Sequence, residues 1–486
     1  MKVAVVGSGP AGLYTAEALV KQAALLSSPI ELHVDVLDRL PTPYGLVRYG
    51  VAPDHKSIKS VANYLRRVLE SPGVTFIGGV HFGTDVTRED LLSAYDAVVY
   101  ATGAMRDRRL GIPGEDLPGS RAATVFVNWY CGHPDMDSDA FTLDAESVAV
   151  IGVGNVAVDV ARILARDPAE LAETDIPEPV MDALRASKVR EVHVIGRRGP
   201  AQAKFTTKEL RELGELPGVH VSTEPAEFEL TEGFDRSGES VALAAADRRV
   251  RGNLVTMAGW GEPPAEPKRR LRVRFWLRPA EIHQSSSGTV AGLRLERTRL
   301  SESGAFEGTG EFETLDAQLV LRSVGYQSVP LSGVPFDARS YTVPNESGRV
   351  LSETGEPLPG EYVAGWLKRG PTGVIGTNKA DAAETVQALL ADLAGGPGAG
   401  EEKLPRPGLL RLPGRDEVPE PEDPAGGSVH RSPLAPVLEA RGVAPVSYAD
   451  WLRISAAEED LAASLGRGDR VKLPHRDAIW TAAKPR

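Results

Sequence analysis

The sequence is short of cysteine, because Cys131 is the only one among 486 residues. A single thiol excludes an intramolecular redox disulfide, and it excludes an iron–sulfur cluster held by several thiolates of this chain. We therefore interpret Cys131 as a small buried apolar residue. The sulfur chemistry of the chain itself offers no basis for a function.

Long apolar runs are missing too, since no stretch approaches the roughly 20 apolar residues that a membrane span needs. The first predicted strand begins at Lys2, which leaves no room for a signal or transit peptide and favours the cytoplasm. Basic charge is in deficit: the formal net charge of −12 argues against nucleic acid as a general partner. With 42% hydrophobic and 25% charged residues, the composition is that of a globular protein of two or three domains.

Glycine, by contrast, is concentrated in two loops that each follow an apolar β run. The first loop is Gly7-Ser8-Gly9-Pro10-Ala11-Gly12, after residues 3–6. In such a loop the glycines allow a tight turn, close approach to a pyrophosphate and tight packing of the following helix. Asp38 ends the next apolar run. A carboxylate there accepts hydrogen bonds from a ribose diol and repels a 2′-phosphate, so the first loop predicts an FAD site.

The second loop is Gly152-Val153-Gly154-Asn155-Val156-Ala157, after residues 147–151. Its next predicted strand ends in Arg197 and Arg198 instead of an acid. Two guanidiniums at that point favour a 2′-phosphate through charge-assisted, bidentate hydrogen bonds, and so predict NADP(H). The plainer alternative is solvated charge on a surface turn. An enzyme that holds two dinucleotides is expected to pass electrons between them.

Alternating β and α patterns predict an α/β protein with two Rossmann-like dinucleotide-binding domains, the NADP domain being inserted into the FAD domain. The pattern is interrupted by turn signals after residue 104 and restarts at 147, residues 219–321 have β-rich patterns, and Ser447 is a plausible helix cap. The predicted divisions are the opening segment of the FAD domain at 1–104, the inserted NADP domain at 105–322, the closing segment of the FAD domain at 323–393, a Pro- and Gly-rich connector at 394–446, and a C-terminal helical segment packing on the FAD domain at 447–486.

Longer motifs carry a family resemblance. They lie at residues 40–48 (LPTPYGLVR), 50–55 (GVAPDH), 155–162 (NVAVDVAR), 196–200 (GRRGP), 205–213 (FTTKELREL) and 365–378 (GWLKRGPTGVIGTN). In this order they resemble the adrenodoxin-reductase-like ferredoxin–NADP⁺ reductases, including those of the mycobacterial type. The resemblance runs from the first strand to about Leu393 and resumes weakly near the C-terminus.

The resemblance implies FAD bound without a covalent link, NADPH as the hydride donor to FAD N5, and single electrons passed on to an iron–sulfur ferredoxin. That ferredoxin would serve a monooxygenase such as a cytochrome P450. By motif position, the implied FAD site comprises Asp38, Leu46, Val80, Trp366, Gly373, Val374 and Ile375. The implied NADP contacts are Asn155, Arg197, Arg198 and Glu209, with Gly373 shared between the cofactors.

His55 and Glu212 match family positions close to the flavin and nicotinamide rings, which makes them the candidate catalytic residues. Each also has a plainer interpretation. His55 follows Pro53-Asp54 and suits a structural histidine in a turn, while Glu212 lies four residues after Lys208 and suits an exposed ion pair. No metal site is predicted.

An acidic ferredoxin would have to dock on a local basic patch, because the whole chain is acidic. Candidates are Lys204, Lys208 and Arg211, at near-helical spacing beside the NADP site. The run 268–270 (Lys-Arg-Arg) is a second candidate that solvated surface charge explains equally well. A monomer is expected.

Other functions compete with this one. A flavoprotein subunit resembling the small subunit of glutamate synthase would carry cluster-binding cysteines in an N-terminal extension, and a thioredoxin-reductase-like enzyme would need a cysteine pair. This chain has neither feature. A flavin monooxygenase would need signatures that are not found. A general NADPH diaphorase, and a nucleotide-binding scaffold or redox sensor without turnover, stay open.

Overall fold

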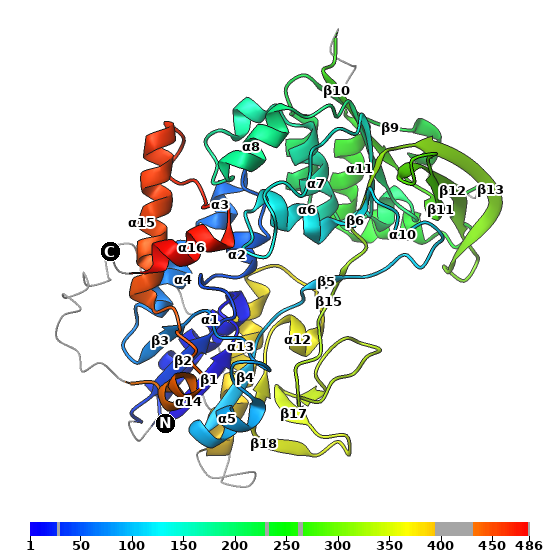
Figure 1. The fold of residues 1–486 in the computed structure, drawn as a ribbon. Coiled ribbons are helices and arrows are strands. Elements are labelled where there is room, and N and C mark those ends of the chain that lie inside the picture. The colour runs from blue at the N-terminus through cyan, green and yellow to red at the C-terminus, as the bar shows by residue number, and fades with distance from the viewer. Residues whose placement is uncertain (27–29, 229–232, 261–265, 394–430, 485–486) are drawn as a thin grey trace. The chain divides into compact units, whose positions relative to one another are not determined.

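The computed structural model describes residues 1–26, 30–228, 233–260, 266–393 and 431–484. The chain divides into two compact units (Figure 1). Unit 1 comprises Met1–Val47, Ser60–Ala104 and Ser328–Leu452, and unit 2 comprises Arg48–Lys59, Met105–Gln327 and Arg453–Arg486. The chain therefore leaves the first unit and returns to it, as the nested arrangement predicts. Residues 48–59 and 453–486 group with the second unit, whereas the predicted boundaries gave them to the FAD domain and to a segment on it.

Unit 1 is built on a seven-stranded sheet with the order β16-β17-β18-β4-β1-β2-β3. Its parallel strands are β1 (Lys2–Val6), β2 (His33–Leu37), β3 (Val74–Ile77), β4 (Ala97–Tyr100) and β18 (Pro357–Val363). The short strands β16 (Asn345–Glu346) and β17 (Arg349–Leu351) add an antiparallel edge. Continuous valine and alanine runs form the central strands because a parallel sheet is buried on both faces. The segment after the insertion thus completes the sheet that the first segment begins.

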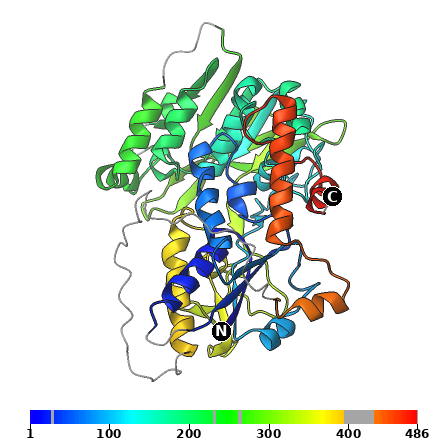
Figure 2. The ribbon, with the colours of Figure 1, turned by 90° about the vertical axis from the view of Figure 1, so that its left-hand side faces the viewer.

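Helices cover this sheet. The helices of unit 1 include α1 (Pro10–Ala23), α4 (Val61–Leu69), α5 (Arg88–Ala94), α12 (Trp366–Arg369), α13 (Thr377–Leu393) and α14 (Ala435–Ala440), while α2 (Leu46–Tyr49) contains the point at which the chain passes from unit 1 to unit 2. Proline at N1 suits the start of α1 because that position needs no N–H donor. The helices α1 and α13 lie side by side (Figures 1 and 2), where Gln22 donates a hydrogen bond to the Ala383 carbonyl. The first and last segments of unit 1 therefore pack together.

Unit 2 is built on a six-stranded parallel sheet with the order β6-β14-β7-β8-β10-β9. The strands are β6 (Ser120–Ala122), β7 (Ser147–Ile151), β8 (Glu191–Ile195), β9 (Val219–Thr223), β10 (Arg269–Arg274) and β14 (Leu319–Arg322). The helices of this unit include α3 (Lys56–Lys59), α6 (Ala123–Tyr130), α7 (Asn155–Ala165), α8 (Glu178–Arg185) and α9 (Thr207–Gly214). The paired strands β5 (Arg106–Asp107) and β15 (Tyr326–Gln327) join the two connecting segments.

A second, antiparallel sheet in unit 2 contains β11 (Leu277–Gln284), β12 (Val290–Leu300) and β13 (Phe306–Asp316). The β-rich prediction for 219–321 was wrong between its strands, where α10 (Glu239–Ala246) and α11 (Arg248–Ala258) form. The prediction followed strand-like patterns such as 271–277. It overlooked residues 242–246, which are rich in alanine and therefore favour a helix. It also overlooked Asp247, which caps α11 by accepting hydrogen bonds from the Arg249 and Val250 N–H groups.

Most of the predicted connector, residues 394–430, lies outside the described residues. The C-terminal segment contains the helices α15 (Tyr448–Leu465) and α16 (Arg476–Ala483). Ser447 caps α15, since its hydroxyl accepts a hydrogen bond from the Asp450 N–H. None of the helices in the described ranges is long and apolar enough to cross a membrane.

Candidate functional site

The first glycine loop is compact enough that side chains would not fit at two of its glycines. A Cβ on Gly12 would collide with the Gly7 carbonyl oxygen, and Gly7 itself has φ +115° with Ala101 beside it. Helix α1 starts at Pro10, directly after the extended Gly9, and no side chain among the described residues caps this end. The loop thus presents backbone N–H groups at a helix N-terminus, which suits a pyrophosphate.

Asp38 follows β2 and supports this loop. Its Oδ2 accepts hydrogen bonds from the Ser8 N–H (2.9 Å) and hydroxyl (2.6 Å), and its Oδ1 accepts from the Leu40 N–H (2.9 Å). An ionised carboxylate has about four acceptor positions, so capacity for a ribose hydroxyl is left. Val80 is buried, and its N–H donates to the Asp38 carbonyl at 2.9 Å. Leu46 is half-buried at the start of α2.

The motif at 40–48 closes over the same loop. The Tyr44 N–H donates to the Ser8 carbonyl at 3.0 Å. Gly45 has φ +48°, and a Cβ on it would lie within 2.9 Å of the Gly9 Cα. Tyr44 adopts φ +82°, an uncommon conformation for an aromatic residue, and its ring meets Trp451 edge-on with centroids 5.9 Å apart. Backbone strain at Tyr44 therefore marks the place where this segment meets the dinucleotide loop.

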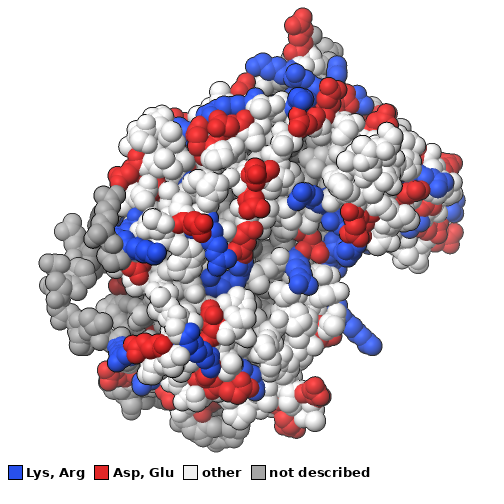
Figure 3. Space-filling model, in the orientation of Figure 1, with Lys and Arg blue, Asp and Glu red and all other residues white. Residues whose placement is uncertain are grey.

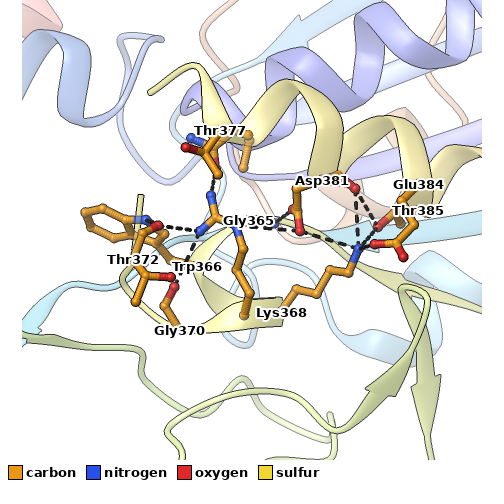
Figure 4. Close-up of polar contacts among 12 residues, drawn as sticks. Gly365, Trp366, Lys368, Gly370, Thr372, Thr377, Asp381, Glu384 and Thr385 are labelled. Carbon is orange, nitrogen blue, oxygen red and sulfur yellow. Dashed lines mark hydrogen bonds and ion pairs between the residues drawn. The ribbon is translucent and has the colours of Figure 1, made fainter. Parts of the chain in front are cut away.

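The segment 365–378 meets α1 at Ala11, and Figure 4 shows the polar contacts that hold this segment against α13. Gly365 has φ +74°, a Cβ there would collide with the Cβ of Ala11, and its N–H donates to Asp381 Oδ2 at 2.5 Å. The buried Lys368 amine forms ion pairs with Asp381 (3.4 Å) and Glu384 (2.6 Å) of α13. These bonds fix α12 against α13 beside the glycine loop.

The turn that carries Gly373, Val374 and Ile375 is supported from behind. The Trp366 indole N–H (3.2 Å) and the Arg369 guanidinium (2.7 Å) both donate to the Thr372 carbonyl. This orients the peptide before Gly373, which has φ +83°. Val374 is 68% exposed in unit 1, and its N–H donates to the Thr377 hydroxyl. The predicted flavin-edge residues thus form one ordered turn.

The second glycine loop, which lies in unit 2, has the same backbone geometry as the first. Gly152 has φ +135°, and a Cβ there would collide with the Ser323 carbonyl. Helix α7 starts at Asn155, whose Oδ1 accepts from the Thr206 N–H at 2.9 Å, and Val156 follows it, partly buried. Gly154 precedes the helix in an extended conformation without a capping side chain in the described part of the chain. A second helix N-terminus is therefore open to phosphate groups.

Arg197 and Arg198 follow β8 in this unit. Among the described residues, no carboxylate forms an ion pair with either guanidinium, and Arg198 Nε has no hydrogen-bond partner there. Burial and then the charge of Arg198 lower the pKa of Arg197 below its usual value. Two adjacent cations in this arrangement favour a dianionic ligand such as a 2′-phosphate.

His55 lies in a buried cluster of charges. Its Nε2 is 2.9 Å from Asp159 Oδ1 and 3.0 Å from Glu209 Oε2, and its Nδ1 is 3.8 Å from Glu212 Oε2. The Arg162 guanidinium, with a side chain only 1% exposed, joins the same carboxylates at 2.8 and 3.2 Å. It also forms a bidentate pair with Asp54 (2.6 and 3.0 Å).

These carboxylates control the protonation of His55. Burial lowers the pKa of His55, and so does the Arg162 guanidinium, whose Nη2 is 2.7 Å from His55 Nε2, but the hydrogen bonds with Asp159 and Glu209 outweigh both and raise the pKa to about 9. Burial acts to raise the pKa of Glu209, yet His55 and Arg162 hold it below its usual range. The atoms of His55, Glu209 and Glu212 lie within 4.8 Å of one another, but Arg162 already supplies the cation that such carboxylates require. A pKa of about 9 favours the protonated form of His55 at neutral pH.

The comparisons with known proteins agree with this geometry. Residues 1–246 match the model of the pyridine nucleotide-disulphide oxidoreductases. The NADPH-ferredoxin reductase FprA of Mycobacterium tuberculosis is 43% identical over 476 residues, which cover 97% of this chain and 96% of that protein. The mitochondrial NADPH:adrenodoxin oxidoreductase of Homo sapiens is 39% identical over 484 residues, covering 97% and 90%. The chain belongs to the FprA and adrenodoxin reductase family.

The solved structure of Mycobacterium tuberculosis FprA in complex with NADPH matches this member of the family with a TM-score of 0.84. That match has 41% sequence identity and covers 99% of each chain. The α/β fold with FAD and NADP Rossmann-type domains is therefore confirmed, and FAD and NADPH are the cofactors of the family. The roles predicted for individual site residues stay predictions.

Sequence reasoning missed several residues of the His55 cluster. Asp54, Asp159 and Arg162 lie within the motifs at 50–55 and 155–162, but the family resemblance implies no role for them. The available signal was an acid and an arginine three residues apart on the otherwise apolar face of α7. The ion pair of Lys208 with Glu212 is also present, at 3.6 Å, beside the contact of Glu212 with His55. Glu212 therefore forms the ion pair of its plainer interpretation, and its catalytic role stays a prediction.

Proposed function

We propose that this protein is an NADPH-dependent ferredoxin reductase, in which FAD receives hydride from NADPH and the electrons leave singly for an iron–sulfur ferredoxin. The observation that supports this function is that the two glycine loops have side chains of opposite charge beside them. One has the carboxylate of Asp38, and the other has two guanidiniums that no carboxylate pairs among the described residues. Bound FAD can accept two electrons together from one donor and release them one at a time.

The residues of the chain bind and orient the two nucleotides. In unit 1 the amides of the first loop and the Asp38 carboxylate would hold the FAD pyrophosphate and ribose, and the Gly373 turn would present its backbone to the ring system. In unit 2 the second loop would hold the NADPH pyrophosphate, and Arg197 with Arg198 would take the 2′-phosphate. The His55 imidazolium would donate a hydrogen bond close to the flavin and nicotinamide rings, where the family resemblance places it.

The ferredoxin partner is expected to dock on local basic charge. On the face drawn in Figure 3, acidic and basic side chains are interspersed. Lys204, Lys208 and Arg211 are exposed in unit 2 and supply a patch of such charge. In the alternative run 268–270, Arg269 donates to the carbonyls of Val189, Ala165 and Arg166, and is thus committed within unit 2. In the first patch Lys208 pairs with Glu212 at 3.6 Å, but no ion pair forms at Lys204 or Arg211 among the described residues, so the first patch is our proposal.

The test begins with the purified protein. We expect it to be yellow, to release FAD on denaturation, and to bleach anaerobically with NADPH at far lower concentrations than with NADH. A colourless protein that FAD does not reconstitute would overturn the proposal. Bleaching by both nucleotides alike would overturn the NADPH assignment alone.

A further inference from the structure

The turn that carries Arg197 and Arg198 is anchored to the start of the antiparallel sheet and not only to its own parallel sheet. The Thr298 hydroxyl of β12 donates to the Arg197 carbonyl at 2.8 Å, and the Trp276 N–H donates to the Arg198 carbonyl at 3.2 Å. Trp276 is fully buried and stacks on Phe234, with centroids 5.5 Å apart and planes at 10°. The backbone of the turn is therefore fixed by residues at 276 and 298.

The side chain of Arg197 is held by the same sheet in a different way. Its guanidinium carbon lies 4.7 Å from the centroid of the Phe306 ring, at the start of β13. Arg278 also approaches this ring, at 5.8 Å, but Arg278 is ion-paired with Glu296. Arg197 has no such carboxylate among the described residues. Phe306 is therefore the contact that orients it.

An aromatic face is suited to this task. A cation over a ring is attracted by the negative π face without donating a hydrogen bond to it. A carboxylate in the same place would orient the guanidinium equally well, but would occupy its N–H donors and neutralise the charge. With the ring below it, all five N–H donors of Arg197 remain for an oxyanion.

We propose that Phe306 is a positioning residue for selectivity between NADPH and NADH, acting through Arg197. This inference rests on the proposed function and extends it to the antiparallel sheet. The antiparallel sheet holds the guanidinium of Arg197, one of the two arginines that we propose to bind the 2′-phosphate, over the ring of Phe306. Loss of the Phe306 ring leaves the charge of Arg197 in place but lets its side chain move. The free energy needed to order that side chain then reduces the affinity for the nucleotide.

The sheet offers a matched control for the test. Phe312, also on β13, is 44% exposed and lies under Arg294, with the guanidinium carbon 3.8 Å from its ring centroid. F306L and F312L thus each remove an arginine–ring contact from the same strand. Only the contact at Phe306 involves an arginine of the turn at 197–198. F306Y keeps an aromatic face and is the conservative rescue.

The experiment compares these variants of the full holoenzyme. Steady-state kinetics with NADPH and NADH are combined with calorimetric binding of 2′,5′-ADP and 5′-ADP. We expect F306L to raise the KM for NADPH and the Kd for 2′,5′-ADP about two- to fivefold, the range of an exposed cation–π contact. The kcat, the KM for NADH and the Kd for 5′-ADP should stay within experimental error. F312L and F306Y should resemble the wild type.

Each other outcome is decisive. Equal losses with NADPH and NADH in F306L, or the same loss in F312L, would show a merely structural role and overturn the inference. An unchanged F306L would overturn it as well, provided that R197A weakens 2′,5′-ADP binding. If R197A has no effect either, the proposed NADPH site itself fails. Should F306L lose its fold by circular dichroism, F306M carries the same comparison.

Discussion

The charge on His55 can be tested by changing a single neighbouring carboxylate. Asp159→Asn keeps the size of the side chain but removes one of the two charges that accept from His55 Nε2, at 2.9 Å. Glu209 remains at 3.0 Å. An opposite charge this close shifts a pKa by about 1–3 units. We therefore expect the His55 pKa to fall from about 9 in the wild type to about 6–8 in D159N.

The assay is an NMR titration of protein carrying ¹³C-labelled histidine. The chain has 9 histidines, and His55 is assigned by the resonance that disappears in H55Q. Asp167→Asn is the control, because Asp167 lies in the same unit and pairs with Lys268, outside the His55 cluster. A wild-type His55 that titrates at or below 6.5, or a D159N that titrates like the wild type, would refute the reasoning.

The same pKa has a consequence for stability. A folded-state pKa raised from 6.5 to about 9 means that protonated His55 stabilises the fold. This contribution is fully present below pH 6.5 and is lost as the pH rises through about 9. At 1.36 kcal/mol per pKa unit it amounts to about 3 kcal/mol. Urea unfolding of the wild type and H55Q at about pH 6 and pH 10 measures it, and a constant difference between the two proteins would contradict it.

Further predictions concern both nucleotide sites and the partner. R197A combined with R198A should raise the KM for NADPH ten- to a thousandfold, since each charged hydrogen bond is worth ~1.5–3 kcal/mol, and unchanged discrimination against NADH would rule out the assignment. G365A should lower FAD retention, measured by the flavin-to-protein absorbance ratio, because a Cβ there would collide with Ala11 at a φ of +74°; a fully flavinated variant would contradict the packing. Ferredoxin-linked cytochrome c reduction should weaken steeply with salt while ferricyanide reduction barely changes, and parallel salt curves would remove the docking patch.

The sequence was informative where chemistry depends on short local motifs. Both glycine loops, the acid at Asp38 and the arginines after β8 stand at fixed offsets from apolar strands, so their placement could be predicted. The return of the chain to the first sheet could be predicted for the same reason, since an apolar strand, a glycine turn and a helix recur at 357–393.

The remaining features depend on tertiary contacts that no local pattern encodes. The pairing of Arg162 with Asp54 joins residues 108 positions apart, and the contact of Arg197 with Phe306 joins two separate sheets. The positive φ of Tyr44 has no sequence signal, because glycine or asparagine would be the usual choice. The helices at 239–258 were missed because strand patterns on one flank were extended over a stretch of strong helix formers.

The central claim is that electrons pass from NADPH through FAD to a one-electron carrier. An anaerobic titration of a [2Fe–2S] ferredoxin with NADPH, in the presence of a catalytic amount of this protein, measures it directly. Each NADPH should reduce two ferredoxins, and omission of the protein, or of its FAD, should abolish the reaction. Flavin that bleaches with NADPH yet leaves a panel of ferredoxins from the same source oxidised would contradict it.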